Sequence, residues 1–170
     1  LPYFEEITNT TEYYCEGDDE PLTTTNYLID QWRGGDYYYM YAKGIKTGTT
    51  DQAGRCLVTS ASADGYSYLL VLLKAPYKEG VEEEYYTFTD AADLFRWALT
   101  SLELNTVAST KTPICEQKVK LSWGKDSVLL VPEKNFSAIV PSDYEEKWIT
   151  IETNGPDEVD APLDTDTVVG

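Results

Sequence analysis

Two runs of apolar residues in the middle of the chain predict neighbouring β-strands. Residues 55–62 alternate apolar and polar side chains, and residues 66–75 contain a continuous apolar stretch at 69–73. The dipeptide Asp64-Gly65 between them favours a tight hairpin turn, so the two strands should pair antiparallel. A strand that is apolar on both faces is expected at the centre of a sheet that helices cover.

A helix is predicted over residues 90–102. Thr89 or Asp90 can cap its start, and Asp93 lies in its first turn, where the helix dipole favours a negative charge. Apolar side chains recur there at three- and four-residue spacing and predict a buried stripe of Leu94, Phe95, Trp97, Ala98 and Leu102. We expect this stripe to pack against the sheet as ordinary core. The preceding residues 76–84 are highly charged and should be exposed.

The pattern at the start of the chain is weaker. Phe4 and Ile7 are spaced as in the last turns of a helix, which the polar residues 8–11 would end. Beyond that point we expect short elements: strands over 12–16 and 23–29, a turn over 17–21 and a loop over 34–36.

The pattern changes after Leu104, where only short β-like runs remain. These runs are Val107, 119–121, 128–131, 138–140 and 148–151, and turn-forming residues such as Pro132 and Pro141 separate them. From residue 154 onward, glycine, prolines and acidic residues suggest a mobile tail or a linker. The predicted fold class is therefore α+β, an antiparallel sheet with helical cover followed by a small all-β domain. The domain boundaries expected are 1–104, 105–152 and 153–170.

The chain is strongly acidic, with 13 basic and 30 acidic residues among 170 and a formal net charge of -17. Such a surface argues against nucleic acid and against electrostatic binding to anionic lipid. No apolar run reaches the roughly 20 residues of a membrane-spanning helix. Because the chain has no histidine, histidine-based triads and histidine-ligated zinc are excluded. We expect no cofactor and no metal.

The three cysteines, Cys15, Cys56 and Cys115, do not have the spacing of metal ligands. They are interpreted as three thiols in the folded protein. A Cys15–Cys56 bridge is the alternative in an exported protein, and it would leave one thiol over.

Residues 44–54 carry the motif with the strongest functional meaning. They contain Lys46-Thr47-Gly48 and end in a polar turn with Gly54. Lys-Thr-Gly is the third signature of penicillin-binding proteins and serine β-lactamases. Together with the Tyr-rich residues 37–41 before it and the alternating run 56–62 after it, the block resembles the low-molecular-mass D-alanyl-D-alanine carboxypeptidases. That family carries a KTGxTxxAG hairpin at this point.

The resemblance covers residues 1 to about 150 and implies roles for five residues. Lys46 would attract the terminal carboxylate of the substrate and stabilise the deprotonated network of the family's nucleophilic serine and its lysine partner. Thr47 would donate its hydroxyl to that carboxylate. Gly48 would let the substrate lie against the strand edge, and the Thr49 backbone N–H would be one of two oxyanion donors. Arg55, across the hairpin, is a further candidate for the carboxylate, although a surface arginine is the simpler interpretation.

The other two family signatures, Ser-x-x-Lys and Ser-x-Asn, are not found before Lys46. Ser122-Trp123-Gly124-Lys125 matches Ser-x-x-Lys in letters, but it follows a strand-like run and contains a glycine that weakens helices. We interpret it as a strand and a turn. The chain is therefore expected to be the C-terminal part of an extracytoplasmic carboxypeptidase that acts on peptidoglycan D-Ala-D-Ala peptides and binds β-lactams, and to be inactive alone. A serine β-lactamase relative and a non-catalytic cell-wall binding module are the alternatives.

Overall fold

The computed structural model describes residues 2–76 and 85–169 and contains two units, Leu1–Thr100 and Ser101–Gly170. The first unit combines two α-helices with antiparallel strands, and the second is built from strands and one short 3-10 turn. The predicted α+β fold class is confirmed. Of the segment 76–84 that was expected to be exposed, residues 77–84 lie outside the described part of the chain.

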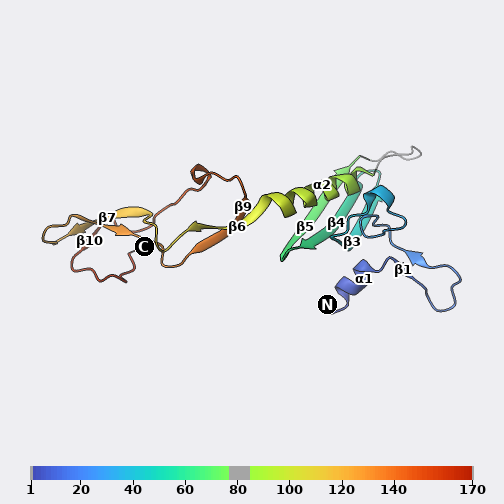
Figure 1. The fold of residues 1–170 in the computed structure, drawn as a ribbon, viewed down its shortest axis with the longest axis horizontal. Helices are drawn as coiled ribbons and strands as arrows, with labels where there is room; N and C mark the ends of the chain where they lie inside the picture. Colours follow the sequence, from blue (N-terminus) through green and yellow to red (C-terminus); the bar gives the residue numbers. More distant parts are fainter. Residues whose placement is uncertain (1, 77–84, 170) are drawn as a thin grey trace. The chain divides into compact units, whose positions relative to one another are not determined.

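The larger of the two described sheets of the first unit has three strands in the order β3-β4-β5 (Figure 1). They are β3 (Ala42–Thr50), β4 (Gly54–Ala63) and β5 (Tyr66–Ala75), and both pairings are antiparallel. Asp64 and Gly65 have φ angles of 52° and 84°, as expected for a two-residue turn that matches the twist of its strands. The predicted hairpin of 55–62 with 66–75 is therefore confirmed. The central place expected for 66–75 was wrong, because β5 is an edge strand of the described sheet and exposes Leu69, Val71 and Leu73.

Helix α2 (Tyr86–Ser101) covers one face of this sheet, but through a different stripe from the predicted one. Its buried residues are Thr87, Phe88, Ala91, Phe95 and Ala98. The predicted stripe was wrong at Leu94 and Trp97, which are 42% and 52% exposed, and Leu102 belongs to a strand. The start was also wrong, because the helix begins before Thr89 and Asp90. Both stripes have helical spacing, and the buried one contains two alanines that let the helix approach the sheet closely.

The hydrophobic core of the first unit lies between α2, the sheet and the chain before β3. Its central residues are Leu28, Ala42, Leu57, Phe88 and Ala91, and they are almost fully buried. Tyrosines surround this centre, among them Tyr27, Tyr37, Tyr39 and Tyr85. The core therefore joins the loop before β3 to the helix after β5.

The beginning of the chain contains helix α1 (Phe4–Asn9), the two-residue strands β1 (Glu12–Tyr13) and β2 (Leu22–Thr23), and the 3-10 helix η1 (Gly35–Tyr37). The predicted strand over 23–29 was wrong. There, Thr24 Oγ1 accepts the Asn26 N–H at 3.1 Å, and Asn26 Oδ1 accepts the Leu28 N–H at 3.2 Å. These side-chain bonds replace the strand pairing with a turn.

The second unit contains two small sheets. Strand β6 (Leu102–Ala108) pairs antiparallel with β9 (Phe136–Pro141). Strand β7 (Cys115–Lys120) pairs antiparallel with β8 (Ser127–Leu130) and parallel with β10 (Glu158–Asp160). Residues 148–151 form no strand, and only the 3-10 helix η2 (Glu146–Trp148) lies there. The segment 153–170, expected as a mobile tail, contributes β10, which an ion pair between Lys120 and Glu158 supports.

Three further features concern the described residues. The cysteines at 15, 56 and 115 are all free, so Cys15 and Cys56 do not form a bridge. Across residues 2–76 and 85–169, no cluster of three or more acidic or thiol side chains is placed to hold a metal ion. Within the same ranges, no helix has both the length and the apolar character needed to cross a membrane.

Candidate functional site

The Lys46-Thr47-Gly48 motif lies in the second half of β3, which is an edge strand of the described sheet. The three residues stand opposite Val58, Leu57 and Cys56 of β4 in an unbroken antiparallel register. Residues directly opposite in such a pair project to the same face of the sheet. The register therefore decides which face each candidate side chain occupies.

Thr47 and Thr49 project to the face that α2 covers, and Lys46 projects to the other face. Thr47 stands opposite Leu57, a core residue that packs with Phe88 and Ala91 of α2. Lys46 is adjacent to Thr47, and the side chains of this part of β3 alternate between the two faces of the sheet without interruption. The ammonium group of Lys46 is exposed and donates to the Thr47 carbonyl oxygen.

Two glycines of β3 show how its edge is covered in one half and open in the other. A Cβ on Gly44 would lie 2.7 Å from both Cβ and Oγ1 of Thr8, so α1 packs closely there. A Cβ on Gly48 would meet no described atom within 4 Å. Packing therefore explains the glycine at 44 but not the glycine at 48, where open space lies beside the motif.

The first half of β3 is fixed by two asparagines from the preceding chain. The Gly44 N–H donates to Asn9 Oδ1 at 2.8 Å, and the buried Asn26 side chain donates from Nδ2 to the Gly44 carbonyl at 3.1 Å. The edge of β3 at this point is therefore satisfied by side chains rather than by another strand.

The hydroxyl of Thr47 contacts a second hydroxyl. Thr25 Oγ1 lies 2.5 Å from Thr47 Oγ1, and either atom could be the donor. Because Thr25 immediately precedes Asn26, the turn that fixes Gly44 also places this hydroxyl against Thr47. Thr25 was not predicted as a site residue, and its distance of 22 positions from Thr47 leaves no local signal in the sequence.

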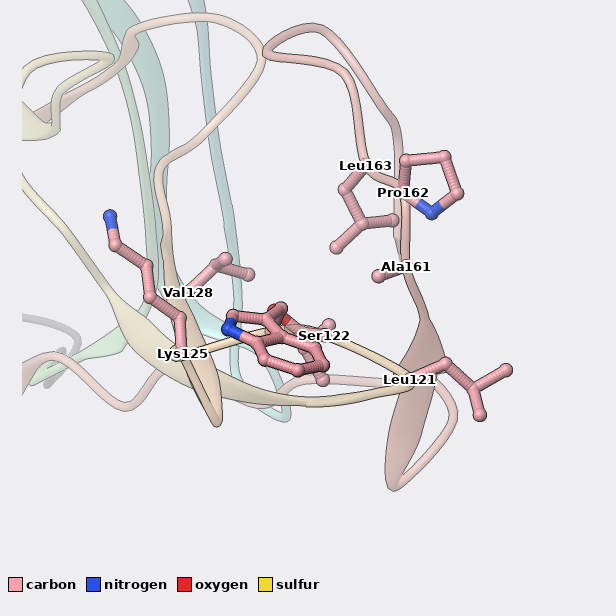
Figure 2. A pocket seen from close by; sticks show the side chains of 9 residues that line it. Leu121, Ser122, Lys125, Val128, Ala161, Pro162 and Leu163 are labelled. Carbon is pink, nitrogen blue, oxygen red and sulfur yellow. The ribbon is translucent and has the colours of Figure 1, made fainter.

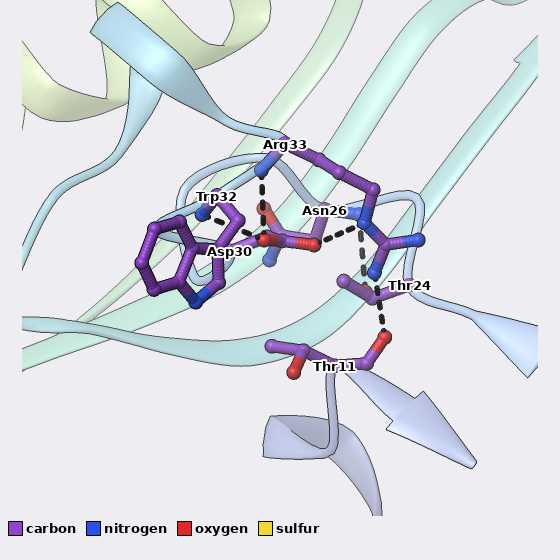
Figure 3. Close-up of polar contacts among 6 residues, drawn as sticks. All are labelled: Thr11, Thr24, Asn26, Asp30, Trp32 and Arg33. Atoms are coloured by element: carbon purple, nitrogen blue, oxygen red, sulfur yellow. Dashed lines mark hydrogen bonds and ion pairs between the residues drawn. The ribbon is translucent and has the colours of Figure 1, made fainter.

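Asp30 anchors the loop that carries Thr25 and Asn26 (Figure 3). Its Oδ1 accepts the backbone N–H groups of Trp32 and Arg33 at 3.0 and 2.9 Å, and its Oδ2 pairs with Arg33 Nε at 2.6 Å. Arg33 also donates to the Thr11 carbonyl at 2.8 Å. Burial opposes ionisation of Asp30, but the hydrogen bonds from Arg33 and Trp32 outweigh it and lower the pKa of this carboxyl below 3.8.

Arg55 stands opposite Thr49 and therefore shares the α2 face with Thr47. Its guanidinium carbon lies 4.0 Å from the ring centroid of Tyr85, the residue that precedes α2. This is well inside the range of a cation–π contact. The structure thus places Arg55 with Thr47 and Thr49 on one face and not with Lys46. Tyr85 was also missed, because its contact with Arg55 joins distant parts of the chain and leaves no local signal in the sequence.

Ser122 and Lys125 lie in the loop between β7 and β8 of the second unit, where residues 121–126 form no helix. Both line a concavity of about 390 Å³ together with apolar residues that include Val128 and Pro162 (Figure 2). No hydrogen bond joins their side chains in the described part of the chain. Ser122 does not begin a helix, so Lys125 is not held one turn later against its hydroxyl. The four residues match Ser-x-x-Lys in sequence but not in structure.

Comparison with known proteins gives one family match and several similar structures. Residues 4–77 match the family D-alanyl-D-alanine carboxypeptidase. A solved D-alanyl-D-alanine carboxypeptidase, DacD from Francisella tularensis, is 26% identical with a TM-score of 0.55, covering 88% of this chain and 33% of that one.

Two further solved structures share the fold. One is a peptidoglycan synthesis regulatory factor (PBP3) from Streptococcus pneumoniae, at 24% identity and a TM-score of 0.56, and the match covers 100% of this chain and 44% of that chain. The other is penicillin binding protein 5 from Haemophilus influenzae, at 22% identity and a TM-score of 0.52, with 100% and 45% covered. This chain thus spans less than half the length of each of these structures.

The matched residues 4–77 include all of β3, β4 and β5 with the Lys46-Thr47-Gly48 motif. The likeness in fold to the solved structures extends through the second unit. Residues 4–77 are therefore similar to the D-alanyl-D-alanine carboxypeptidase family, and the chain as a whole shares its fold with the solved structures.

Proposed function

We propose that this chain supplies the substrate-recognition strand of a serine-type D-alanyl-D-alanine carboxypeptidase that acts on peptidoglycan stem peptides. In this reaction a serine oxygen attacks the carbonyl between the two D-alanines. The terminal D-alanine leaves with a proton on its amino group, and water then hydrolyses the ester and regenerates the serine. The observation that carries the proposal is Lys46-Thr47-Gly48 on an edge strand beside open space.

Lys46 and Thr47 have separate roles in this proposal because they project to opposite faces of β3. The Thr47 hydroxyl donates to the substrate's terminal carboxylate, and its contact with Thr25 favours one orientation of that hydroxyl. The Lys46 ammonium supplies the positive charge that attracts the carboxylate and stabilises the deprotonated Ser/Lys pair.

Gly48 and Thr49 bring the backbone to the substrate. The open space at Gly48 lets an extended peptide lie against the strand edge and pair with its backbone. The Thr49 N–H then acts as one oxyanion donor, a group that contributes about 3 kcal/mol to transition-state stabilisation in comparable sites. Its partner donor is the N–H of the nucleophile itself.

Arg55 adds a second cation for the terminal carboxylate. It stands opposite Thr49 and on the same face as Thr47, so its guanidinium lies on the side to which the Thr47 hydroxyl projects. A guanidinium can bind a carboxylate through two parallel hydrogen bonds, which a lysine cannot do.

We assign no nucleophile within this chain. The serine of the only Ser-x-x-Lys sequence, Ser122, lies in a loop of the second unit, and Ser-x-Asn does not occur. The nucleophile is therefore proposed to come from residues other than these 170, which would make the chain the C-terminal part of the enzyme. The same observation favours a second candidate, a non-catalytic cell-wall binding module that keeps the open strand edge beside Gly48.

The partners and the location of the protein follow from the proposed reaction. The ligands are peptidoglycan peptides that end in D-Ala-D-Ala, and β-lactams that imitate them, which places the protein outside the cytoplasm. A serine β-lactamase relative is less consistent with the β-rich second unit, since β-lactamases end soon after their last helix.

Labelling with a fluorescent penicillin tests this function. The native protein that contains this chain should form a covalent adduct on a denaturing gel, and residues 1–170 alone should form none. An adduct that maps to Ser122 would overturn the assignment of roles. Tight binding of D-Ala-D-Ala peptides by the native protein without any adduct or turnover would favour the binding module.

A further inference from the structure

We propose that Tyr85 is a positioning residue for Arg55 and thereby sets the affinity of the site for the substrate's terminal carboxylate. The inference rests on the proposed function, because it is Arg55 that contacts the carboxylate. The inference goes beyond the proposed function because Tyr85 lies outside the sheet and outside the Lys-Thr-Gly block.

The contact between Arg55 and Tyr85 has the geometry of a cation–π interaction. The guanidinium carbon lies 4.0 Å from the ring centroid, and Arg55 is half-buried. Partial burial strengthens the attraction between a cation and the negative face of a ring, because water competes less.

Tyr85 is itself held by other aromatic residues on several sides. Its ring makes edge contacts with Tyr27 and Tyr37, with centroids 5.4 and 5.8 Å apart, and stacks on Phe88 of α2 at 5.7 Å. Its backbone N–H donates to the Tyr37 hydroxyl at 3.1 Å. The ring is therefore a fixed platform, because it is packed into the core cluster that joins α2 to the sheet.

The platform lies where it can orient the guanidinium toward the substrate side. Arg55 is the register partner of Thr49, whose N–H is the proposed oxyanion donor, and it shares a face with Thr47. A long arginine side chain has many rotamers, and restricting them before the substrate arrives reduces the entropy lost on binding. Tyr85 is therefore expected to affect substrate affinity more than the chemical step.

Steady-state kinetics of the native protein test this role, with a peptide that ends in D-Ala-D-Ala as substrate. In Tyr85→Leu we expect KM to rise roughly three- to tenfold, the size of a partly buried cation–π contact, with kcat within about twofold. Tyr85→Phe keeps the ring and should stay within about twofold of the wild type in both. In an Arg55→Ala background, Tyr85→Leu should have no further effect, because its action passes through the guanidinium.

Fluorinated phenylalanines at position 85 provide a second series in case Tyr85→Leu does not fold. Fluorination weakens the negative ring face while it keeps the shape of the side chain, so KM should rise with each added fluorine at unchanged thermal stability. A structural role alone would not produce this trend.

The outcomes separate the two proposals. If the wild type turns over the peptide but Tyr85→Leu and the fluorinated series leave KM unchanged, the role of Tyr85 is overturned and the proposed function stands. An effect of Tyr85→Leu that persists in Arg55→Ala also overturns it. If the wild type shows neither turnover nor a penicillin adduct, the proposed function fails, and the carboxylate role of Arg55 fails with it.

Discussion

Lys46 and Arg55, the two cations predicted to serve one site, lie on opposite faces of the three-stranded sheet. Lys46 stands opposite Val58 on the outer face, and Arg55 stands opposite Thr49 on the face that α2 covers. In the proposed function, a substrate at the edge of β3 would therefore meet the two charges from different sides. They should not be interchangeable, and their removal should affect different kinetic parameters.

The two glycines of β3 should respond in opposite ways to alanine. Gly44→Ala should lower the free energy of unfolding by about 1–3 kcal/mol, because its Cβ would collide with Thr8. Gly48→Ala should leave stability within about 0.5 kcal/mol, since its Cβ meets open space, but should slow penicillin acylation of the native protein. Urea unfolding and acylation rates check the pair. Equal stability losses would show that the edge at Gly48 is covered.

The contact between Thr25 and Thr47 predicts an effect of Thr25 on substrate affinity. Thr25→Val removes the hydroxyl that lies against Thr47, and KM for the D-Ala-D-Ala peptide should rise about threefold to tenfold. Thr25→Ser should retain most of the wild-type affinity. Thr23→Val, in the exposed strand β2, is the matched control and should change nothing. A wild-type KM in Thr25→Val would contradict the positioning of Thr47.

The buried stripe of α2 can be distinguished from the predicted one by stability measurements. Phe95 is 2% exposed, so Phe95→Ala should cost about 3–5 kcal/mol. Leu94→Ala, on the neighbouring exposed position, should cost less than about 1 kcal/mol. Denaturant unfolding of both variants gives the comparison. Similar costs for the two would support the stripe that the sequence suggested.

Asp30 should make the free energy of unfolding depend on pH in the acidic range. Its pKa is lowered in the folded protein, so its ionised form contributes stability that is fully present above the ordinary value of 3.8 and is lost as the pH falls through the lower folded value. Asp30→Asn should cost about 1–3 kcal/mol at neutral pH. The difference between wild type and variant should shrink as the pH falls below 3.8. A difference that stays constant down to the acid transition would contradict the pKa direction.

The hairpin β4–β5 could be predicted because its signals are local. Asp64 and Gly65 favour the positive φ angles that the turn needs, and the flanking residues form one alternating run and one continuous apolar run. The face of α2 could not be predicted, because two stripes with helical spacing compete and only the sheet decides between them. The strand expected over 23–29 failed because Asn26 uses its side chain to bond the backbone at 28.

The candidate site was only partly visible in the sequence. The Lys46-Thr47-Gly48 motif is contiguous and could be found directly. Thr25 reaches the site through a contact with Thr47, 22 residues later in the chain. Tyr85 reaches it through a contact with Arg55, which lies on the other side of the β4–β5 hairpin in the sequence. Pairing between distant segments also hid β10, whose parallel pairing with β7 joins residues about 40 positions apart. The roles given to the five site residues remain predictions.

The acylation rate of Lys46→Ala tests the central claim most directly. In the native protein, with a fluorescent penicillin as substrate, we expect the rate to fall by about 10²–10³, because the substrate carboxylate and the Ser/Lys pair lose their cation. Arg55→Ala should reduce it by about tenfold or less and should mainly raise KM for the peptide. Acylation of Lys46→Ala at nearly the wild-type rate would contradict the assignment of β3 as the substrate-recognition strand.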